Sequence, residues 1–67
     1  MTITPVLLST NTTDNSATIL VDGKRWEYIF ASPDTLRRLD FLMRRWPLRG
    51  LNFAKRRAIV ATTVQLH

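Results

Sequence analysis

The segment Ala17-Thr-Ile-Leu-Val-Asp-Gly-Lys-Arg-Trp-Glu-Tyr-Ile-Phe30 decides the fold of this chain, because it predicts a β-hairpin. Two runs of strand-forming residues flank Asp22-Gly23. This dipeptide is typical of two-residue hairpin turns, in which both central residues need a positive φ. A turn of this length predicts three strand pairs, which are Val21 with Lys24, Ile19 with Trp26 and Ala17 with Tyr28.

The predicted register sorts the hairpin side chains onto two chemically different faces, as a half-buried antiparallel pair requires. The face expected to pack in the core carries Ala17, Ile19, Val21, Trp26, Tyr28 and Phe30. The opposite, mostly polar face carries Thr18, Leu20, Arg25, Glu27 and Ile29. Aromatic rings on a sheet can also stack on bases, but this register favours the core for Trp26, Tyr28 and Phe30.

One main helix is predicted to follow the hairpin. Ser32 is a good N-cap, Pro33 suits the first helical position, and Asp34 complements the positive end of the helix dipole. Pro47 is expected to end the helix at about Arg45 or Trp46, since the residue before a proline avoids the α region. An apolar stripe about 120° wide is expected to pack on the hairpin and consists of Leu36, Leu39, Leu42, Met43 and Trp46.

The remaining segments complete the predicted fold. Residues 2–10 are β-branched and apolar, and Pro5 favours a sheet edge or a strand that begins after it. Residues 48–50 are expected to form a turn, 51–58 two short helical turns, and 59–66 a final strand. The prediction is an α+β fold over 1–67, a single small domain. It has an antiparallel three- or four-stranded sheet with one main helix packed on one face, in the order β-β-β-α-β.

The composition argues against catalysis. The chain of 67 residues has no cysteine, and its one histidine is the final residue, His67. The five carboxylates are scattered, and no glycine-rich phosphate loop is present. General acid–base chemistry and metal sites draw on clustered histidines and carboxylates. We therefore expect a protein that is not an enzyme and that has no cofactor and no metal site.

Positive charge is concentrated in the second half of the chain. The net charge is +5 and the isoelectric point is near 11.2. Residues 1–31 hold two cations against three carboxylates, whereas residues 32–67 hold eight cations against only Asp34 and Asp40. Such an asymmetry predicts attraction to polyanions.

One aromatic ring stands among the arginines of the helix. Phe41 points away from the apolar stripe, and its neighbours at the i−4, i−3, i+3 and i+4 positions are Arg37, Arg38, Arg44 and Arg45. Side chains at these offsets touch on a helix surface. Arginine pairs with phosphate or carboxylate and stacks on rings, so this cluster is a candidate contact surface. Alternatively, Phe41 packs under residues 51–57 and the arginines form a solvated face, with Asp40 paired to Arg37 or Arg44.

A second basic cluster lies at Arg49 and at Lys55-Arg56-Arg57. It either extends the first cluster into a stripe or forms a solvated turn. If both clusters face one way, binding to DNA would fall steeply with salt. The candidate partner-binding residues are Arg37, Arg38, Phe41, Arg44, Arg45, Arg49, Lys55, Arg56 and Arg57.

Three kinds of partner are consistent with the two basic clusters and the ring of Phe41. The first is nucleic acid, bound mainly through its backbone, or an acidic nucleoprotein complex. The second is a protein complex to which the chain docks as an inhibitor or adaptor. The third is a second copy of the chain, paired through an edge strand near 2–10 or 59–66. No signal peptide or membrane span is visible, so a cytoplasmic protein without membrane contact is expected.

The run from Val21 to Pro33, followed by a leucine-containing helix and Leu51-Asn-Phe53, resembles the small KTSC domain. In this resemblance, which covers roughly residues 18–55, Trp26 and Tyr28 occupy the positions of an aromatic pair. Where that family has an aromatic residue before asparagine, this sequence has Asn52-Phe53. The resemblance implies a module associated with nucleic acid. In size and autonomy the chain also resembles small proteins of phages and mobile elements, such as anti-CRISPR inhibitors.

Overall fold

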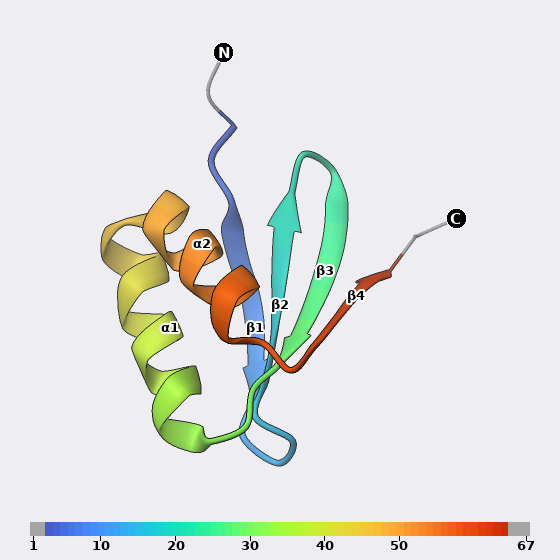
Figure 1. Ribbon diagram of the computed structural model, residues 1–67. Helices are drawn as coiled ribbons and strands as arrows, with labels where there is room; N and C mark the ends of the chain where they lie inside the picture. Colours follow the sequence, from blue (N-terminus) through green and yellow to red (C-terminus); the bar gives the residue numbers. More distant parts are fainter. Residues whose placement is uncertain (1–2, 65–67) are drawn as a thin grey trace.

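The computed structural model describes residues 3–64 and has an α+β fold, as the sequence predicts. A four-stranded antiparallel sheet with the strand order β1-β2-β3-β4 carries two helices on one face (Figure 1). In chain order the elements are β1 (Val6–Asn11), β2 (Ser16–Val21), β3 (Lys24–Ile29), α1 (Pro33–Arg45), α2 (Pro47–Arg57) and β4 (Val60–Val64).

The hairpin of β2 and β3 has the predicted register. Val21 pairs with Lys24, and the pairs Ile19–Trp26 and Ala17–Tyr28 follow along the ladder. At the turn, φ is 51° at Asp22 and 75° at Gly23. Both values lie in the left-handed region that a two-residue hairpin turn of this kind needs, so the local sequence specifies the pairing.

The two outer strands also agree with the sequence analysis. β1 begins directly after Pro5 and forms one edge of the sheet, and its pairing with β2 is interrupted by a bulge between Leu7 and Ser9. β4 forms the other edge and pairs with β3, Tyr28 lying opposite Ala61. The predicted strand 59–66 extends at 65–66 beyond the described residues.

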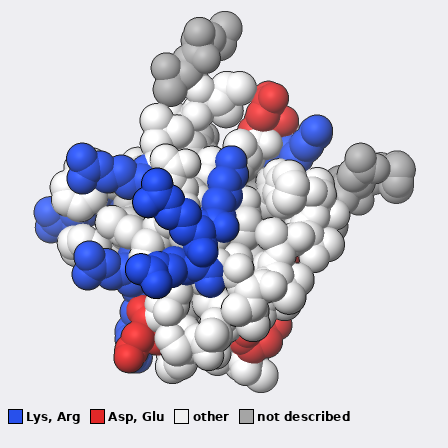
Figure 2. Space-filling model, in the orientation of Figure 1, with Lys and Arg blue, Asp and Glu red and all other residues white. Residues whose placement is uncertain are grey.

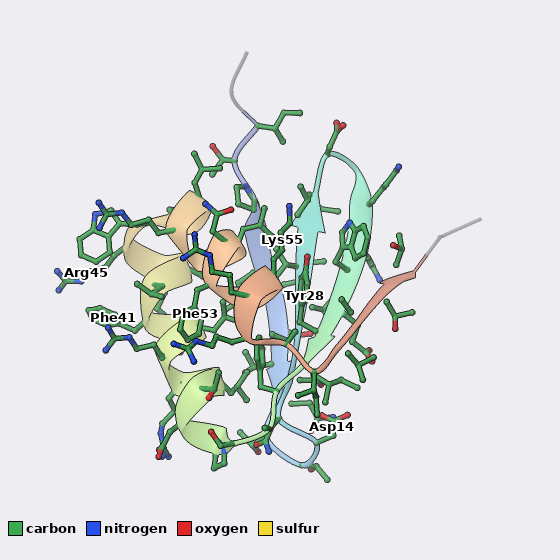
Figure 3. All side chains as sticks on the ribbon, in the orientation of Figure 1. Asp14, Tyr28, Phe41, Arg45, Phe53 and Lys55 are labelled. Atoms are coloured by element: carbon green, nitrogen blue, oxygen red, sulfur yellow. The ribbon has the colours of Figure 1, made fainter. Side chains whose placement is uncertain are left out.

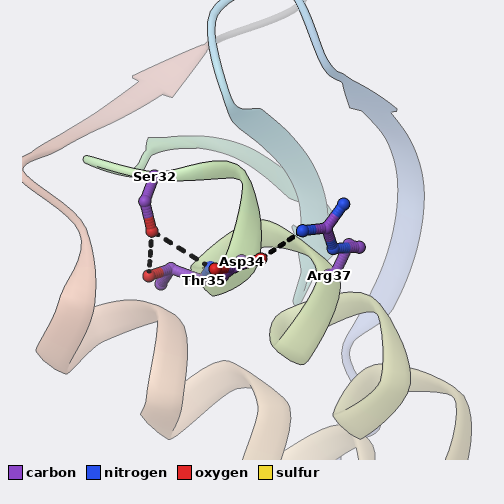
Figure 4. A network of polar contacts seen from close by, with 4 residues as sticks. All are labelled: Ser32, Asp34, Thr35 and Arg37. Atoms are coloured by element: carbon purple, nitrogen blue, oxygen red, sulfur yellow. Dashed lines mark hydrogen bonds and ion pairs between the residues drawn. The ribbon is translucent and has the colours of Figure 1, made fainter.

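Helix α1 begins and ends where the local signals predict. The Ser32 side chain accepts a hydrogen bond of 3.3 Å from the backbone N–H of Thr35, and the two hydroxyl groups lie 2.9 Å apart (Figure 4). Pro33 occupies the first turn. The helix ends at Arg45, before Trp46-Pro47.

One residue of the predicted apolar stripe is not part of the core. Leu36, Leu39 and Met43 are buried and Leu42 is half-buried, but Trp46 is 46% exposed. The prediction of a core position for Trp46 was wrong, because its backbone (φ −136°, ψ 82°) leaves the helix. Its ring therefore no longer follows the 3.6-residue period that relates it to Met43.

The second helix is longer than predicted. Residues 48–50 are helical rather than a turn, and α2 runs without interruption from Pro47 to Arg57. Pro47 ends α1 but also begins α2, since proline has the backbone angle required at a first helical position. Gly50 then lets α2 approach α1 closely: a Cβ at this position would lie 2.5 Å from the sulfur of Met43.

The core lies between the helices and the inner face of the sheet. Its fully buried large side chains come from the sheet (Tyr28 and Ile19), from the segment after β3 (Phe30) and from α1 (Leu39). Val21 and Trp26, which were also predicted to be core residues, are only partly buried and pack at its margin. They lie near the hairpin turn, at one end of the inner face.

We predict that Gly50→Ala destabilises the protein by about 1–3 kcal/mol, because the added methyl group overpacks the contact with Met43. Urea unfolding monitored by circular dichroism would measure the loss. Asn52→Ala, at an exposed position of the same helix, is the matched control and should not lower stability. Equal stability of Gly50→Ala and the wild type would show that the helices do not depend on this approach.

A pH prediction follows from the burial of Tyr28, which raises the pKa of its hydroxyl group. The Tyr28 hydroxyl then ionises more easily in the unfolded chain than in the folded protein. The stabilisation that the protonated, buried hydroxyl gives the folded state is therefore complete below the unfolded pKa of about 10, and it is lost as pH rises towards the folded value. The unfolding free energy should fall above that pH more in the wild type than in Tyr28→Phe. Tyrosinate absorbance reports this group alone, because the chain has one tyrosine. If Tyr28 of the folded protein ionised at the ordinary tyrosine pKa of about 10, the prediction would be contradicted.

Candidate functional site: a basic groove between two helices

Positive side chains gather over the two helices. Figure 2 shows a dense group of lysine and arginine side chains on this face, whereas the part over the strands carries few charges. Helix α1 contributes the arginines at 37, 38, 44 and 45, and α2 those at 49, 56 and 57. The two clusters predicted from the sequence therefore lie on neighbouring helices that pack against each other.

Within this surface, two adjoining hollows surround Phe53. One, of about 340 Å³, is lined by Arg49, Asn52, Phe53, Arg56 and Arg57. The other, of about 260 Å³, is lined by Asp34, Thr35, Arg38, Phe53 and Arg57. The two hollows share Phe53 and Arg57. We call them together the arginine groove, and its lining includes Arg38, Arg49, Asn52, Phe53, Arg56 and Arg57. Figure 3 shows Phe53 lying between the two helices.

Ion pairs divide the arginines of α1 into two groups. Arg37 pairs with Asp34 (Figure 4), and the Nε of Arg44 lies 3.1 Å from a carboxylate oxygen of Asp40. These pairs are exposed and contribute little stability, but they place a negative charge beside each cation. Within residues 3–64, neither Arg38 nor any arginine of α2 forms an ion pair. Asp34, the carboxylate that lines one of the two hollows, is itself paired with Arg37, so the arginines of the groove keep no ion-pair partner of their own among the described residues.

A row of alternating cations and rings adjoins the groove. The guanidinium carbon of Arg45 lies 5.2 Å from the centre of the Phe41 ring, which meets Trp46 edge to face at 6.4 Å. The guanidinium carbon of Arg49 lies 5.6 Å from the centre of the Trp46 ring. We call Arg45, Phe41, Trp46 and Arg49 the aromatic row. It joins the groove at Arg49, which belongs to both.

The ring predicted as a contact residue is accessible. Phe41 is 50% exposed and does not pack under residues 51–57, so the alternative of a buried ring is excluded. In Figure 3 its side chain, with that of Arg45, projects from the outer side of α1. The cation–π contacts within the row hold two rings at the surface, where arginine and aromatic residues commonly form binding contacts.

Not all of the predicted residues form one site. Lys55 lines a different hollow, together with residues of the sheet. Arg37 and Arg44 lie on the edge of α1 that carries the two ion pairs. The groove instead adds Asn52 and Phe53, and the row adds Trp46, which the sequence reading missed. One signal for Phe53 was present, since Arg49, Arg56 and Arg57 stand at the same helical offsets from it as the arginines do from Phe41.

Comparisons with known protein families, curated proteins and solved structures found no match to this chain. The resemblances to the KTSC domain and to small phage proteins stay predictions. Among residues 3–64, no three histidine or carboxylate side chains lie close enough to bind a metal ion. No helix in the same part of the chain has the length and apolarity needed to cross a bilayer.

We predict that Phe41→Ala leaves the fold intact and lowers stability by less than about 1 kcal/mol, because half of its surface already contacts water. Phe30→Ala, at a buried position, is the contrasting variant and should cost about 3–5 kcal/mol. Thermal unfolding of both variants would test this difference. Severe destabilisation by Phe41→Ala would show that the ring supports the core.

Proposed function

We propose that this protein is a non-enzymatic binding protein that engages single-stranded nucleic acid through the arginine groove and the aromatic row. One observation carries the proposal: Arg38 of α1 and three arginines of α2 converge on Phe53, and none of them has an ion-pair partner among residues 3–64. Like charges held close together repel each other. A bound polyanion relieves that repulsion.

The dimensions of the groove suit successive phosphates. Arg49 and Arg56 are seven residues apart on α2, which is about 10 Å along the helix axis. Arg38 and Arg57 line the same hollow from opposite helices. Guanidinium groups bind phosphate oxygens in a bidentate manner, so a phosphodiester strand lying between the helices would meet cations on both sides.

The aromatic row supports a single strand rather than a duplex. Phe41 and Trp46 are each about half exposed at the end of the groove. An unpaired base can stack on such a ring and gain about 1–3 kcal/mol, whereas the bases of a duplex are already stacked. An RNA or DNA strand would be met in the cytoplasm, which is the compartment that this proposal assumes.

A second candidate function rests on the same aromatic row. Phe41, Trp46 and Leu48 form exposed apolar surface beside arginines, a composition typical of protein-binding hot spots. The corresponding proposal is an inhibitor of phage or mobile-element type that docks on a host defence protein complex. It expects tight, stoichiometric binding to one complex and little affinity for isolated nucleic acid.

The main test is binding to a short fluorescein-labelled oligothymidylate, followed by fluorescence anisotropy over a range of salt concentrations. Four neutralised phosphates predict a slope of log K against log salt of about −2.8 for a single strand. Arg38→Gln with Arg57→Gln should reduce this slope by about 1.4 and weaken binding at least tenfold. Phe41→Ala should weaken it by a similar factor through lost base stacking.

Arg37→Gln with Arg44→Gln is the matched control, because it removes the same charge from the edge of α1 that carries the ion pairs. It should weaken binding much less than the groove variant. Equal effects of the two double variants would mean that net charge alone attracts the strand. No binding at micromolar protein, together with nuclease-resistant capture of a single protein complex, would instead favour the second candidate.

A further inference from the structure

The helices leave part of the inner face of the sheet uncovered. In Figure 1 both helices lie over the side of β1 and β2, while β4 diverges from them at the far edge. Along that edge Tyr28 pairs with Ala61 and Trp26 with Thr63, so these four residues share one face of the sheet. Trp26 is only partly buried there.

A hollow of about 320 Å³ opens at this place, at the lower end of the size range of small-molecule pockets. Its lining consists of Val21, Trp26, Tyr28, Lys55 and Ala61, and we call it the β3–β4 pocket. The rings of Trp26 and Tyr28 are stacked, with centres 6.2 Å apart and planes inclined by 17°. The wall of the pocket is therefore aromatic and mainly apolar.

Two polar groups accompany this apolar wall. The Lys55 side chain reaches it from α2, and within residues 3–64 its ammonium group forms no ion pair. Figure 3 shows Lys55 and Tyr28 approaching the same space from helix and sheet. Tyr28 is almost completely buried but lines the hollow, and its hydroxyl, which is protonated at neutral pH as in any tyrosine, can donate a hydrogen bond. Glu27, the carboxylate between the two rings in sequence, belongs to the opposite face of the sheet.

The β3–β4 pocket is separate from the arginine groove. Lys55 and Phe53 are two residues apart on α2, and side chains at that spacing point in nearly opposite directions. None of the residues that line the β3–β4 pocket lines the two hollows of the groove. A ligand in one site does not need to displace a ligand in the other.

We propose that the β3–β4 pocket binds a small planar aromatic molecule that carries one anionic group. The ring lies against Trp26, and the anionic group meets the Lys55 ammonium and the Tyr28 hydroxyl. The chemistry admits two sources, an aromatic carboxylate or the base and phosphate of a mononucleotide. Each offers a flat ring and an anionic group, which is bonded directly to the ring in the carboxylate and joined to it through the ribose in the mononucleotide.

The test uses the two tryptophan indole N–H signals in a ¹H–¹⁵N correlation spectrum of the full chain. Trp26 reports the β3–β4 pocket, and Trp46 reports the aromatic row. Titration with 2-naphthoate should shift the Trp26 indole signal and the amide signals of Tyr28 and Ala61, and leave the Trp46 indole signal in place. No shift at Trp26 with millimolar 2-naphthoate, or shifts centred on Trp46, would overturn the proposal.

The neutral probe 2-naphthamide and the variant Lys55→Gln test the charge requirement. Lys55 is exposed, so the variant should keep the fold. Lys55→Gln should weaken naphthoate binding about fivefold, the worth of an exposed ion pair, and leave naphthamide binding unchanged. Equal affinity of the wild type for both probes would refute an anion site.

A parallel titration with adenosine monophosphate distinguishes the two sources. Shifts at Trp26 would identify mononucleotides as ligands, and their absence beside a naphthoate response would identify aromatic carboxylates. Oligonucleotide binding by the groove is measured separately and involves none of the residues of this pocket. Failure of either proposal therefore leaves the other open to its own test.

Discussion

The close approach of α1 and α2 at Gly50 is the contact on which the surface chemistry of this protein depends. A Cβ at this position would lie 2.5 Å from the sulfur and 3.0 Å from the backbone nitrogen of Met43, so glycine lets the two helices lie this near each other without displacing Met43. Pro47 supplies the other half of the constraint, because it ends α1 and begins α2 without an intervening loop. Together they bring Arg38 and Arg57, which are distant in sequence, to one hollow.

This arrangement determines how much of the positive charge is free for a partner. Asp34 and Asp40 each hold an arginine of α1 about one helical turn away. Arg38 instead lines a hollow with Arg57 of α2, and Asp34, which lines the same hollow, is already paired with Arg37. A net charge of +5 is thus divided into a partly neutralised edge and a groove with concentrated cations. Local charge density, rather than net charge, favours a polyanion there.

The small size of the domain explains why a second hollow exists. A chain of this length has one modest core, and its two helices lie over β1 and β2 and leave the edge of β3 and β4 uncovered. Trp26 therefore remains only partly buried beside Tyr28, although the hairpin register places both rings on the inner face. Helix α2 separates the two candidate sites, with Phe53 on one side and Lys55 on the other.

Short-range signals alone predicted most of the fold. Asp22-Gly23 specified the hairpin register, Ser32 specified the start of α1, and Pro5 and Pro47 limited β1 and α1. Each acts through backbone angles or hydrogen bonds within a few residues, so no knowledge of distant contacts is needed. The offset of Phe41 from the apolar stripe left two outcomes open, an exposed ring or a ring under residues 51–57, and the structure has the exposed ring.

The positions of Trp46 and Phe53 illustrate what the sequence did not settle. The helical period placed Trp46 in the core, but a backbone change at one residue moved its ring to the surface. Phe53 carries the same arginine pattern as Phe41, yet only packing against α1 makes it the floor of a groove. The sequence by itself determined the strands, the hairpin register and the basic character of the helices, because these follow from local backbone preferences and composition. Only the tertiary structure decided which arginines meet and which rings face water, because those outcomes depend on how closely two helices pack across a glycine.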